Sequence, residues 1–173
     1  NLDPPLDPSG FGLCPVEVGE WAGFVFVRLE PGTEGLVEAV ARPDRTLARY
    51  GLGELVTGLC LDYDVAANWK VVAENYNECY HCGPVHPELC RLVPAFGGGG
   101  AGLDWDAGVP HREGAWTFTL SGTTARAPLP GLDDAERVRH KGELVYPNLM
   151  LSCSADHVAA FRLVPLAVDR TRM

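Results

Sequence analysis

The chain has 173 residues, which suits one domain with a buried core, because a chain of this size buries roughly 70% of its unfolded surface. Its 14 Lys+Arg and 23 Asp+Glu give a formal net charge of −9 at pH 7, so no basic stripe is available to follow a phosphate backbone. No apolar run reaches the roughly 18 residues of a membrane span, and no secretory signal pattern opens the chain. Composition therefore predicts a folded cytoplasmic protein that binds neither nucleic acid nor a membrane.

The first part of the chain predicts a linker followed by the start of a domain. Residues 1–15 are rich in proline and glycine, which break helices and strands, so we expect a linker there and a domain over residues 16–173. Aromatic and β-branched residues fill residues 21–29 up to Pro31-Gly32, a pattern typical of one strand closed by a turn. A short helix is predicted within residues 34–49.

The strongest helix pattern follows a second predicted strand at residues 59–63. We expect Asp64 to cap this helix and its body to include residues 68–76. The helix should end near Gly83-Pro84, because Pro84 lacks a backbone donor and disfavours helical geometry at the residue before it.

The rest of the chain predicts antiparallel strands over residues 115–121, 142–152 and 157–166, with turn residues 154–156 between the last two. Strands on both sides of one central helix indicate an α+β fold, in which an antiparallel sheet is folded around that helix and encloses a cavity. A turn signal at residues 169–173 predicts one more partner strand. We therefore expect the sheet to be truncated at the C-terminus.

Glu78, His81 and His86 form an E-x-x-H-x4-H pattern in the segment that is richest in reactive side chains. Glu78 and His81 are three residues apart and would share one face of a helix. His86 would point about 140° away from His81 on a regular helix, but a break at Gly83-Pro84 lets it turn back. Two neutral imidazoles can then meet one metal ion, and imidazole suits iron, zinc, copper and nickel. The same spacing also fits histidines that only pack or hydrogen-bond at a helix end.

The six cysteines are too few for a small disulfide scaffold, and we expect them to be reduced thiols. Three of them lie close to the two histidines in the sequence. A zinc site made by Cys79, Cys82, His86 and Cys90 is therefore an alternative, although structural zinc usually takes two well-separated pairs of ligands.

Four short motifs resemble the catalytic domain of the Rieske non-heme iron oxygenases, the family of aromatic-ring-hydroxylating dioxygenase alpha subunits. They are Asn68-Trp69-Lys70, Glu74-Asn75-Tyr76, Glu78-Cys79-Tyr80-His81 and His86-Pro87-Glu88-Leu89. The likeness extends more weakly to residues 21–27, which look like the strand that enters that domain, and to residues 146–148, which look like a later core strand. The resemblance implies a helix-grip (SRPBCC-like) fold around a cavity.

The resemblance also implies a role for each residue of the E-x-x-H-x4-H pattern. His81 and His86 match the two histidines that bind mononuclear Fe(II). Glu78 matches the acidic residue, often Asp in relatives, that links this iron to the Rieske cluster of a neighbouring subunit. Such a site activates O2 to hydroxylate or N-demethylate a small organic substrate. The implied partners are an NAD(P)H-dependent reductase or a ferredoxin, and copies of the chain in a homotrimer.

Two parts of the family's machinery are missing from this sequence. A 2Fe-2S Rieske cluster needs Cys-x-His and Cys-x-x-His, and the chain has Cys79-x-His81 without the second pair, so we expect the cluster in a missing N-terminal domain. The family's third iron ligand is a carboxylate on a later helix, which we expect beyond Met173. No motif marks a ligand among the acidic residues after His86, which include Asp104, Asp106, Asp133, Asp134, Glu136, Glu143, Asp156 and Asp169.

The substrate is the least determined feature. Glu rather than Asp at position 78, within Glu-Cys-Tyr-His-Cys, is closer to the branch that acts on quaternary ammonium compounds such as glycine betaine or carnitine, and aromatic-ring dihydroxylation is an alternative. A trimethylammonium group favours an aromatic cage, but most of the available aromatic residues should lie in the core: Tyr76, Trp105, Trp116, Phe118, Tyr146 and Phe161. A non-catalytic helix-grip module that binds a hydrophobic or cationic molecule is the alternative from another class.

Overall fold

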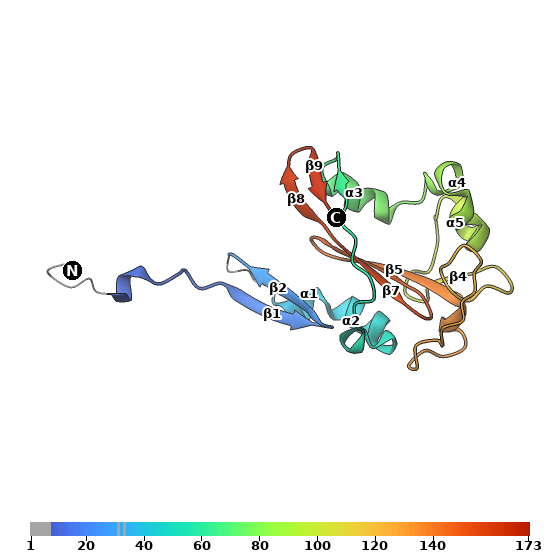
Figure 1. Ribbon diagram of the computed structural model, residues 1–173, viewed down its shortest axis with the longest axis horizontal. Helices are drawn as coiled ribbons and strands as arrows, with labels where there is room; N and C mark the ends of the chain where they lie inside the picture. The colour runs from blue at the N-terminus through green and yellow to red at the C-terminus, as the bar shows by residue number, and fades with distance from the viewer. Residues whose placement is uncertain (1–7, 31, 33) are drawn as a thin grey trace.

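The computed structural model describes residues 8–30, 32 and 34–173, and it combines short helices with antiparallel strands in an α+β arrangement (Figure 1). The helices are α1 (Leu36–Ala39), α2 (Ala41–Leu47), α3 (Trp69–Asn77), α4 (Cys82–Val85) and α5 (Pro87–Leu92), with 3-10 turns η1 (Pro8–Phe11), η2 (Ala48–Tyr50), η3 (Leu52–Glu54), η4 (Pro94–Gly98) and η5 (Glu136–Val138). The strands are β1 (Glu17–Trp21), β2 (Phe24–Arg28), β3 (Asp64–Val65), β4 (Val109–Pro110), β5 (Arg139–Val145), β6 (Leu149–Cys153), β7 (Val158–Arg162), β8 (Val164–Ala167) and β9 (Arg170–Arg172).

Within the described part of the chain, the strands form three antiparallel sheets. The largest has the order β4-β5-β6-β7, a second has the order β3-β9-β8, and β1 pairs with β2 alone. In Figure 1 the β1–β2 hairpin extends away from the rest of the protein, whereas α3, α4 and α5 lie on the opposite side of the large sheet from α2. The central helix therefore lies over a sheet, as expected for a helix-grip fold.

The large sheet buries a different set of side chains on each face, because successive side chains of a strand point to opposite faces. On one face, Lys141 of β5 donates to the carbonyl oxygen of Thr46 in α2 at 3.0 Å, and Arg42 of α2 donates to both carboxylate oxygens of Glu143 at 2.6 Å. Leu47 of α2 packs in a buried apolar cluster with side chains of β5 and β6. These contacts fix α2 to β5.

On the other face, α3 packs against β6. Ala73, Met150 and Leu163 form a buried cluster, and the hydroxyl of Tyr76 donates to the carbonyl oxygen of Leu151 at 2.6 Å. Because Tyr76 sits one turn after Ala73, the same helix face supplies the apolar contact and the polar anchor. The position of the C-terminal end of α3, from which the E-x-x-H-x4-H segment continues, is thus set by the sheet.

One segment that the sequence predicts as a single strand is a hairpin, and another begins later than predicted. Residues 142–152 turn at residues 146–148 between β5 and β6, so the prediction of one strand is wrong there, because a run of β-branched and aromatic residues fits one strand or two. The strand predicted at residues 21–29 is β2, which begins only at Phe24 because Ala22 and Gly23, with φ of 53° and 82°, form the turn from β1. The turn at residues 154–156 is confirmed, since the Ser154 N–H donates to the His157 carbonyl oxygen at 2.9 Å.

Other boundaries also differ from the predictions. The strand expected at residues 59–63 begins instead at Asp64, which pairs with β9, so Asp64 does not cap the helix. The cap is Asn68, whose side-chain oxygen accepts from the Lys70 N–H at 3.0 Å. Residues 115–121 form turns instead of a strand. The helix predicted within residues 34–49 is confirmed, but it is divided into α1, α2 and η2.

Among the described residues, no helix has both the length and the apolar character needed to cross a membrane.

Candidate metal centre

The E-x-x-H-x4-H segment begins where α3 ends. The helix stops at Asn77, whose side-chain amide donates to the Ala73 carbonyl oxygen at 2.7 Å, and Glu78 is extended with φ −107° and ψ 155°. The prediction that Glu78 and His81 share a helix face, with a break only at Gly83-Pro84, is therefore wrong. A turn at residues 79–82 brings Glu78 and His81 together instead.

The carboxylate of Glu78 accepts hydrogen bonds from the turn that follows it. Its Oε2 accepts from the Tyr80 N–H at 2.5 Å and from the His81 N–H at 3.4 Å, while its Oε1 lies 2.5 Å from His81 Nδ1. Burial opposes the charged form, but the bonds from the His81 ring and the Tyr80 N–H outweigh it and lower the pKa of Glu78. Glu78 is thus an ionised acceptor near neutral pH.

This contact determines the tautomer of His81. An ionised carboxylate can only accept hydrogen bonds, and Glu78 Oε1 lies closer to Nδ1, at 2.5 Å, than the Asn75 amide nitrogen does, at 3.2 Å. In the neutral ring the proton therefore lies on Nδ1, and Nε2 keeps its lone pair. Metal-binding histidines commonly have this arrangement, in which the distal ring nitrogen donates to a carboxylate. The Asn75 amide donates to the same Glu78 oxygen at 3.4 Å. Asn75 had no predicted role, although its spacing of three residues from Glu78 was the available signal.

His86 lies between α4 and α5, where a proline interrupts the helix. Pro87 begins α5, and a residue before proline disfavours helical geometry; His86 accordingly has φ −121° and ψ 62°. Pro84 is tolerated inside α4 because it lies in the first turn, where no intrahelical donor is required. The break that orients His86 therefore comes from Pro87, not from Gly83-Pro84.

The two imidazole rings lie close enough to share a metal ion. Their centroids are 5.1 Å apart, with 81° between the ring planes. With metal–nitrogen distances of about 2.1 Å, two imidazoles bound at right to tetrahedral angles have centroids roughly 4.6–5.3 Å apart. His81 is partly buried beside Glu78, whereas His86 is exposed. The observed spacing matches the one expected for two imidazoles bound to a single metal ion.

The structure brings no third ligand to this pair from the described residues, where no group of three or more His, Cys, Asp or Glu side chains is arranged to hold a metal. The later carboxylates have other partners. Asp106 and Glu143 pair with Arg42, and Asp156 accepts from Thr117 and Arg126. Each of these three carboxylates is thus engaged by a cationic or hydroxyl side chain.

Five of the six aromatic side chains that could form a cation cage are divided among three clusters, whereas Tyr146 is 73% exposed. Trp116 packs with the α2 cluster, Trp105 and Phe118 pack near α5, and Tyr76 and Phe161 pack under α3. Their separation agrees with the expectation that most of them belong to the core.

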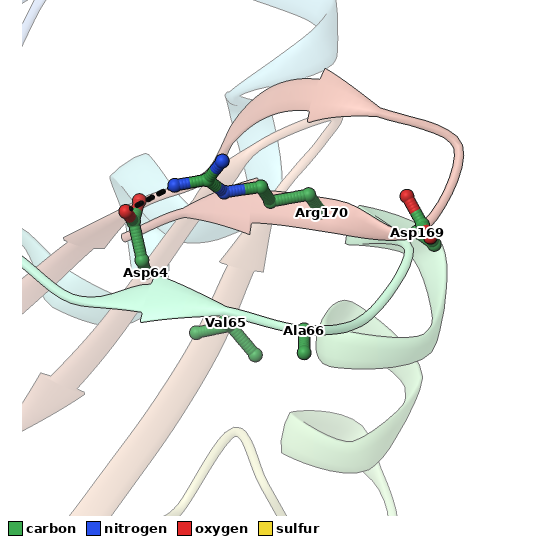
Figure 2. Close-up of a pocket in the computed structure, with 5 residues that line it drawn as sticks. All are labelled: Asp64, Val65, Ala66, Asp169 and Arg170. Carbon is green, nitrogen blue, oxygen red and sulfur yellow. Dashed lines mark hydrogen bonds and ion pairs between the residues drawn. The ribbon is translucent and has the colours of Figure 1, made fainter.

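Two surface hollows of about 280 Å³ lie beside β3 and β9, not beside the histidines. Figure 2 shows one of them, which is lined by Asp64, Val65, Ala66, Asp169 and Arg170, with Arg170 donating to Asp64 at 2.6 Å. Arg170 and Asp64 pair with each other, whereas Asp169, the other charged residue of the lining, forms no ion pair with the described residues.

Cys79 and Cys82 are joined by a disulfide bond, so the expectation that all thiols are reduced is wrong for this pair. The bond is possible because the turn at residues 79–82 brings their Cα atoms to 4.9 Å. It also removes two of the four ligands of the alternative zinc site.

Residues 52–173 match the family model described as the ring hydroxylating alpha subunit catalytic domain. The glycine betaine monooxygenase oxygenase subunit of Chromohalobacter salexigens is 28% identical over 197 residues, which cover 96% of this chain and 44% of that protein. The carnitine monooxygenase oxygenase subunit of Escherichia coli is 36% identical over 99 residues, covering 51% of this chain and 24% of that protein. This chain thus spans less than half the length of these relatives.

Solved structures of the quaternary ammonium Rieske monooxygenase CntA share the fold. The complex with an inhibitor has a TM-score of 0.64 at 21% identity, covering 96% of this chain and 42% of that one. The complex with gamma-butyrobetaine has a TM-score of 0.60 at 21% identity, covering 96% and 41%. The helix over an antiparallel sheet in this chain is therefore the arrangement found in the catalytic domain of a Rieske oxygenase.

Proposed function

Because this chain belongs to the family of ring-hydroxylating alpha subunits, whose catalytic domain residues 52–173 match, we propose that His81 and His86 bind a mononuclear Fe(II) ion. The observation that carries the proposal is the contact of Glu78 with His81 Nδ1, which leaves the Nε2 lone pair available beside the ring of His86. Iron bound there would supply the binding and reduction of O2. The third ligand would come from a residue outside the described set.

The protein residues would hold and orient the metal-binding nitrogens. Glu78 keeps the proton on His81 Nδ1, and the Tyr80 N–H keeps Glu78 ionised. The side chain of Glu78 is 29% exposed, so a group on another subunit can reach it. We propose that electrons enter through Glu78 from a Rieske cluster on a neighbouring subunit of a homotrimer. An NAD(P)H-dependent reductase or ferredoxin would supply that cluster.

The proposed reaction is the oxygenation of a small quaternary ammonium compound, by hydroxylation or N-demethylation. The similarity to glycine betaine and carnitine monooxygenase subunits supports this class over aromatic-ring dihydroxylation. In a monooxygenation, one oxygen atom of O2 enters a C–H bond of the substrate, and the other leaves as water after taking two electrons and two protons.

Metal binding by single variants tests the proposal. Under argon, His81→Ala and His86→Ala should each abolish Fe(II) binding, whereas Glu78→Gln, which loses the charged partner of His81, should lower Fe(II) affinity on the order of 10- to 100-fold. His157→Ala is the matched control, because His157 also pairs with a carboxylate, Asp156, at 2.9 Å. It should bind Fe(II) like the unaltered chain.

Unchanged Fe(II) binding in both His81→Ala and His86→Ala would refute the iron site. If the chain then still bound glycine betaine or carnitine in an NMR titration, it would be a binding module without a metal. Binding of an aromatic acid but of neither quaternary ammonium compound would contradict the proposed substrate class.

A further inference from the structure

The disulfide between Cys79 and Cys82 closes the turn that contains His81. Both cysteines are buried, with exposed fractions of 8% and 3%. They pack in one cluster with apolar residues that follow in α5 and η4, namely Leu92, Val93 and Phe96. Nothing in the proposed reaction uses this bond. Its position between Glu78 and His86 nevertheless places it at the centre of the metal-binding segment.

The backbone connects the bridge directly to both histidines. The Cys82 N–H donates to the Cys79 carbonyl oxygen at 3.1 Å, so the bridge and this hydrogen bond close the same turn. The Cys82 carbonyl oxygen in turn accepts from the His86 N–H at 2.9 Å, and the His81 carbonyl oxygen accepts from the Val85 N–H at 2.9 Å. A change in the turn therefore moves His81 and His86 relative to each other.

The loop that covers Cys79 is built to approach it closely. Gly100 has φ +72°, a left-handed conformation that favours glycine, and a Cβ there would lie 2.9 Å from the Cβ of Cys79. Glycine at this position thus allows the backbone to lie directly against the bridge. Of the two bonded residues, Cys79 is the more exposed.

We propose that Cys79 and Cys82 are a reversible redox pair, and that their bridge holds His81 and His86 in the spacing required for a metal. The statement that the pair is reversible depends only on the disulfide bond, whereas the statement that the bridge supports metal binding rests on the proposed iron site. Loss of the bridge frees a four-residue loop, and its closure entropy corresponds to about a 20-fold change in an equilibrium constant. We therefore expect metal affinity to change on the order of tenfold.

The oxidant is a peroxide, such as the hydrogen peroxide that forms when O2 takes two electrons without oxidising a substrate. One thiolate attacks a peroxide oxygen, the O–O bond breaks, and a sulfenic acid forms as hydroxide leaves and takes up the thiol proton. The second thiol attacks that sulfur, the S–O bond breaks, and the Sγ–Sγ bond forms with release of a second water. In the reverse direction, one thiol of a dithiol reagent attacks the Cys79 sulfur, and Cys82 leaves and takes up a proton. The second thiol of the reagent then attacks its own bonded sulfur, so that Cys79 also leaves and takes up a proton and the reagent is released as its own disulfide.

Thiol labelling of the metal-free 173-residue chain tests the redox step. Peptides that contain Cys79 and Cys82 should take up a maleimide only after treatment with dithiothreitol, and they should lose this reactivity again after hydrogen peroxide. Cys90→Ser is the matched control, because Cys90 lies in the same cluster without a bond and its loss should change nothing. Labelling of both cysteines before reduction and again after peroxide would refute the redox pair.

Two measurements test the link to the histidines. In the metal-free chain, amide exchange at the His86 N–H should become about tenfold faster after reduction, while exchange in β5 and β6 stays the same. Ni²⁺ should bind the bridged chain about tenfold more tightly than a Cys79→Ser, Cys82→Ser double variant, which lacks both the bridge and competing thiols. Equal His86 exchange in both states, or equal Ni²⁺ affinity, would refute the link.

Failure of the iron site gives a different pattern. If His81→Ala in the bridged state bound Ni²⁺ as tightly as the unaltered chain, the proposed metal site would be wrong. The labelling result and the His86 exchange rate would still decide whether the pair is reversible and whether it controls the turn.

Discussion

Replacing His140 should remove part of the acid sensitivity of this protein. His140 lies on β5, its ring stacks on Phe118 at 4.3 Å between centroids, and its Nδ1 has no hydrogen-bond partner among the described residues. Burial, followed by the nearby rings of His111 and His157, lowers the pKa of His140 to about 3. Burial alone lowers the pKa of His111 to about 4.

The sign of the effect follows from which state binds the proton. An unfolded histidine takes up a proton as the pH falls below about 6.5, while buried His140 stays neutral, so the stability it contributes is present above this pH and is lost as the pH falls further. Well below the pKa of the unfolded histidine, each such histidine lowers the free energy of unfolding by about 1.4 kcal/mol for every pH unit. Between about pH 7 and about pH 4.5, this difference in proton uptake should lower the free energy of unfolding by about 2.5 kcal/mol for each of His140 and His111.

His140→Leu isolates one of these two contributions. Near pH 7 the lost stacking on Phe118, about 1 kcal/mol, opposes the gain from removing an unpaired nitrogen, about 1–3 kcal/mol, so the variant should stay close to the unaltered chain. Urea unfolding followed by tryptophan fluorescence at about pH 7 and about pH 4.5 should show that the variant loses about 2.5 kcal/mol less. His86→Ala, which removes an exposed histidine, should keep the original dependence. If His140→Leu lost as much unfolding free energy on acidification as the unaltered chain, burial of neutral His140 would not be a source of the acid sensitivity.

Three further substitutions test the fold around the site. Asn68→Ala should lower the free energy of unfolding by about 1 kcal/mol, because it removes the cap of α3; an unchanged melting temperature would contradict that role. Arg42→Ala should cost about 3 kcal/mol near neutral pH, because Glu143 keeps a carboxylate that is only 8% exposed. Since burial raises the pKa of Glu143, this loss of stability should become smaller as the pH falls. The double variant Arg42→Ala, Glu143→Gln should recover part of the lost stability. A loss that does not depend on pH would argue against the unpaired carboxylate as its cause. Gly131→Ala should destabilise by more than about 2 kcal/mol, because its Cβ would run into the Arg49 carbonyl oxygen, and a native melting curve would rule out that clash.

The sequence could predict which residues form the candidate site, but not how these residues are arranged. The spacing of Glu78, His81 and His86 identified the three side chains, and the structure brings them together. A separation of three residues, however, fits a helix face and a tight turn equally well. The turn forms because α3 ends at Asn77, and Pro87 then orients His86. The predicted break at Gly83-Pro84 had the right consequence for His86 but the wrong proline.

Local sequence patterns were enough to predict the α+β class, a helix whose body includes residues 69–76 and the identity of the metal-binding candidates, because helix periodicity, proline geometry and motif spacing act over a few residues. They did not give the two ends of that helix. Only the tertiary structure decided the turns inside residues 21–29 and 142–152, since a run of β-branched residues favours strands without saying where they reverse. It also decided the contact of Tyr76 with Leu151 and the bond between Cys79 and Cys82. The first joins residues 75 positions apart, and the second depends on where α3 ends, so local sequence preferences carry no information on either.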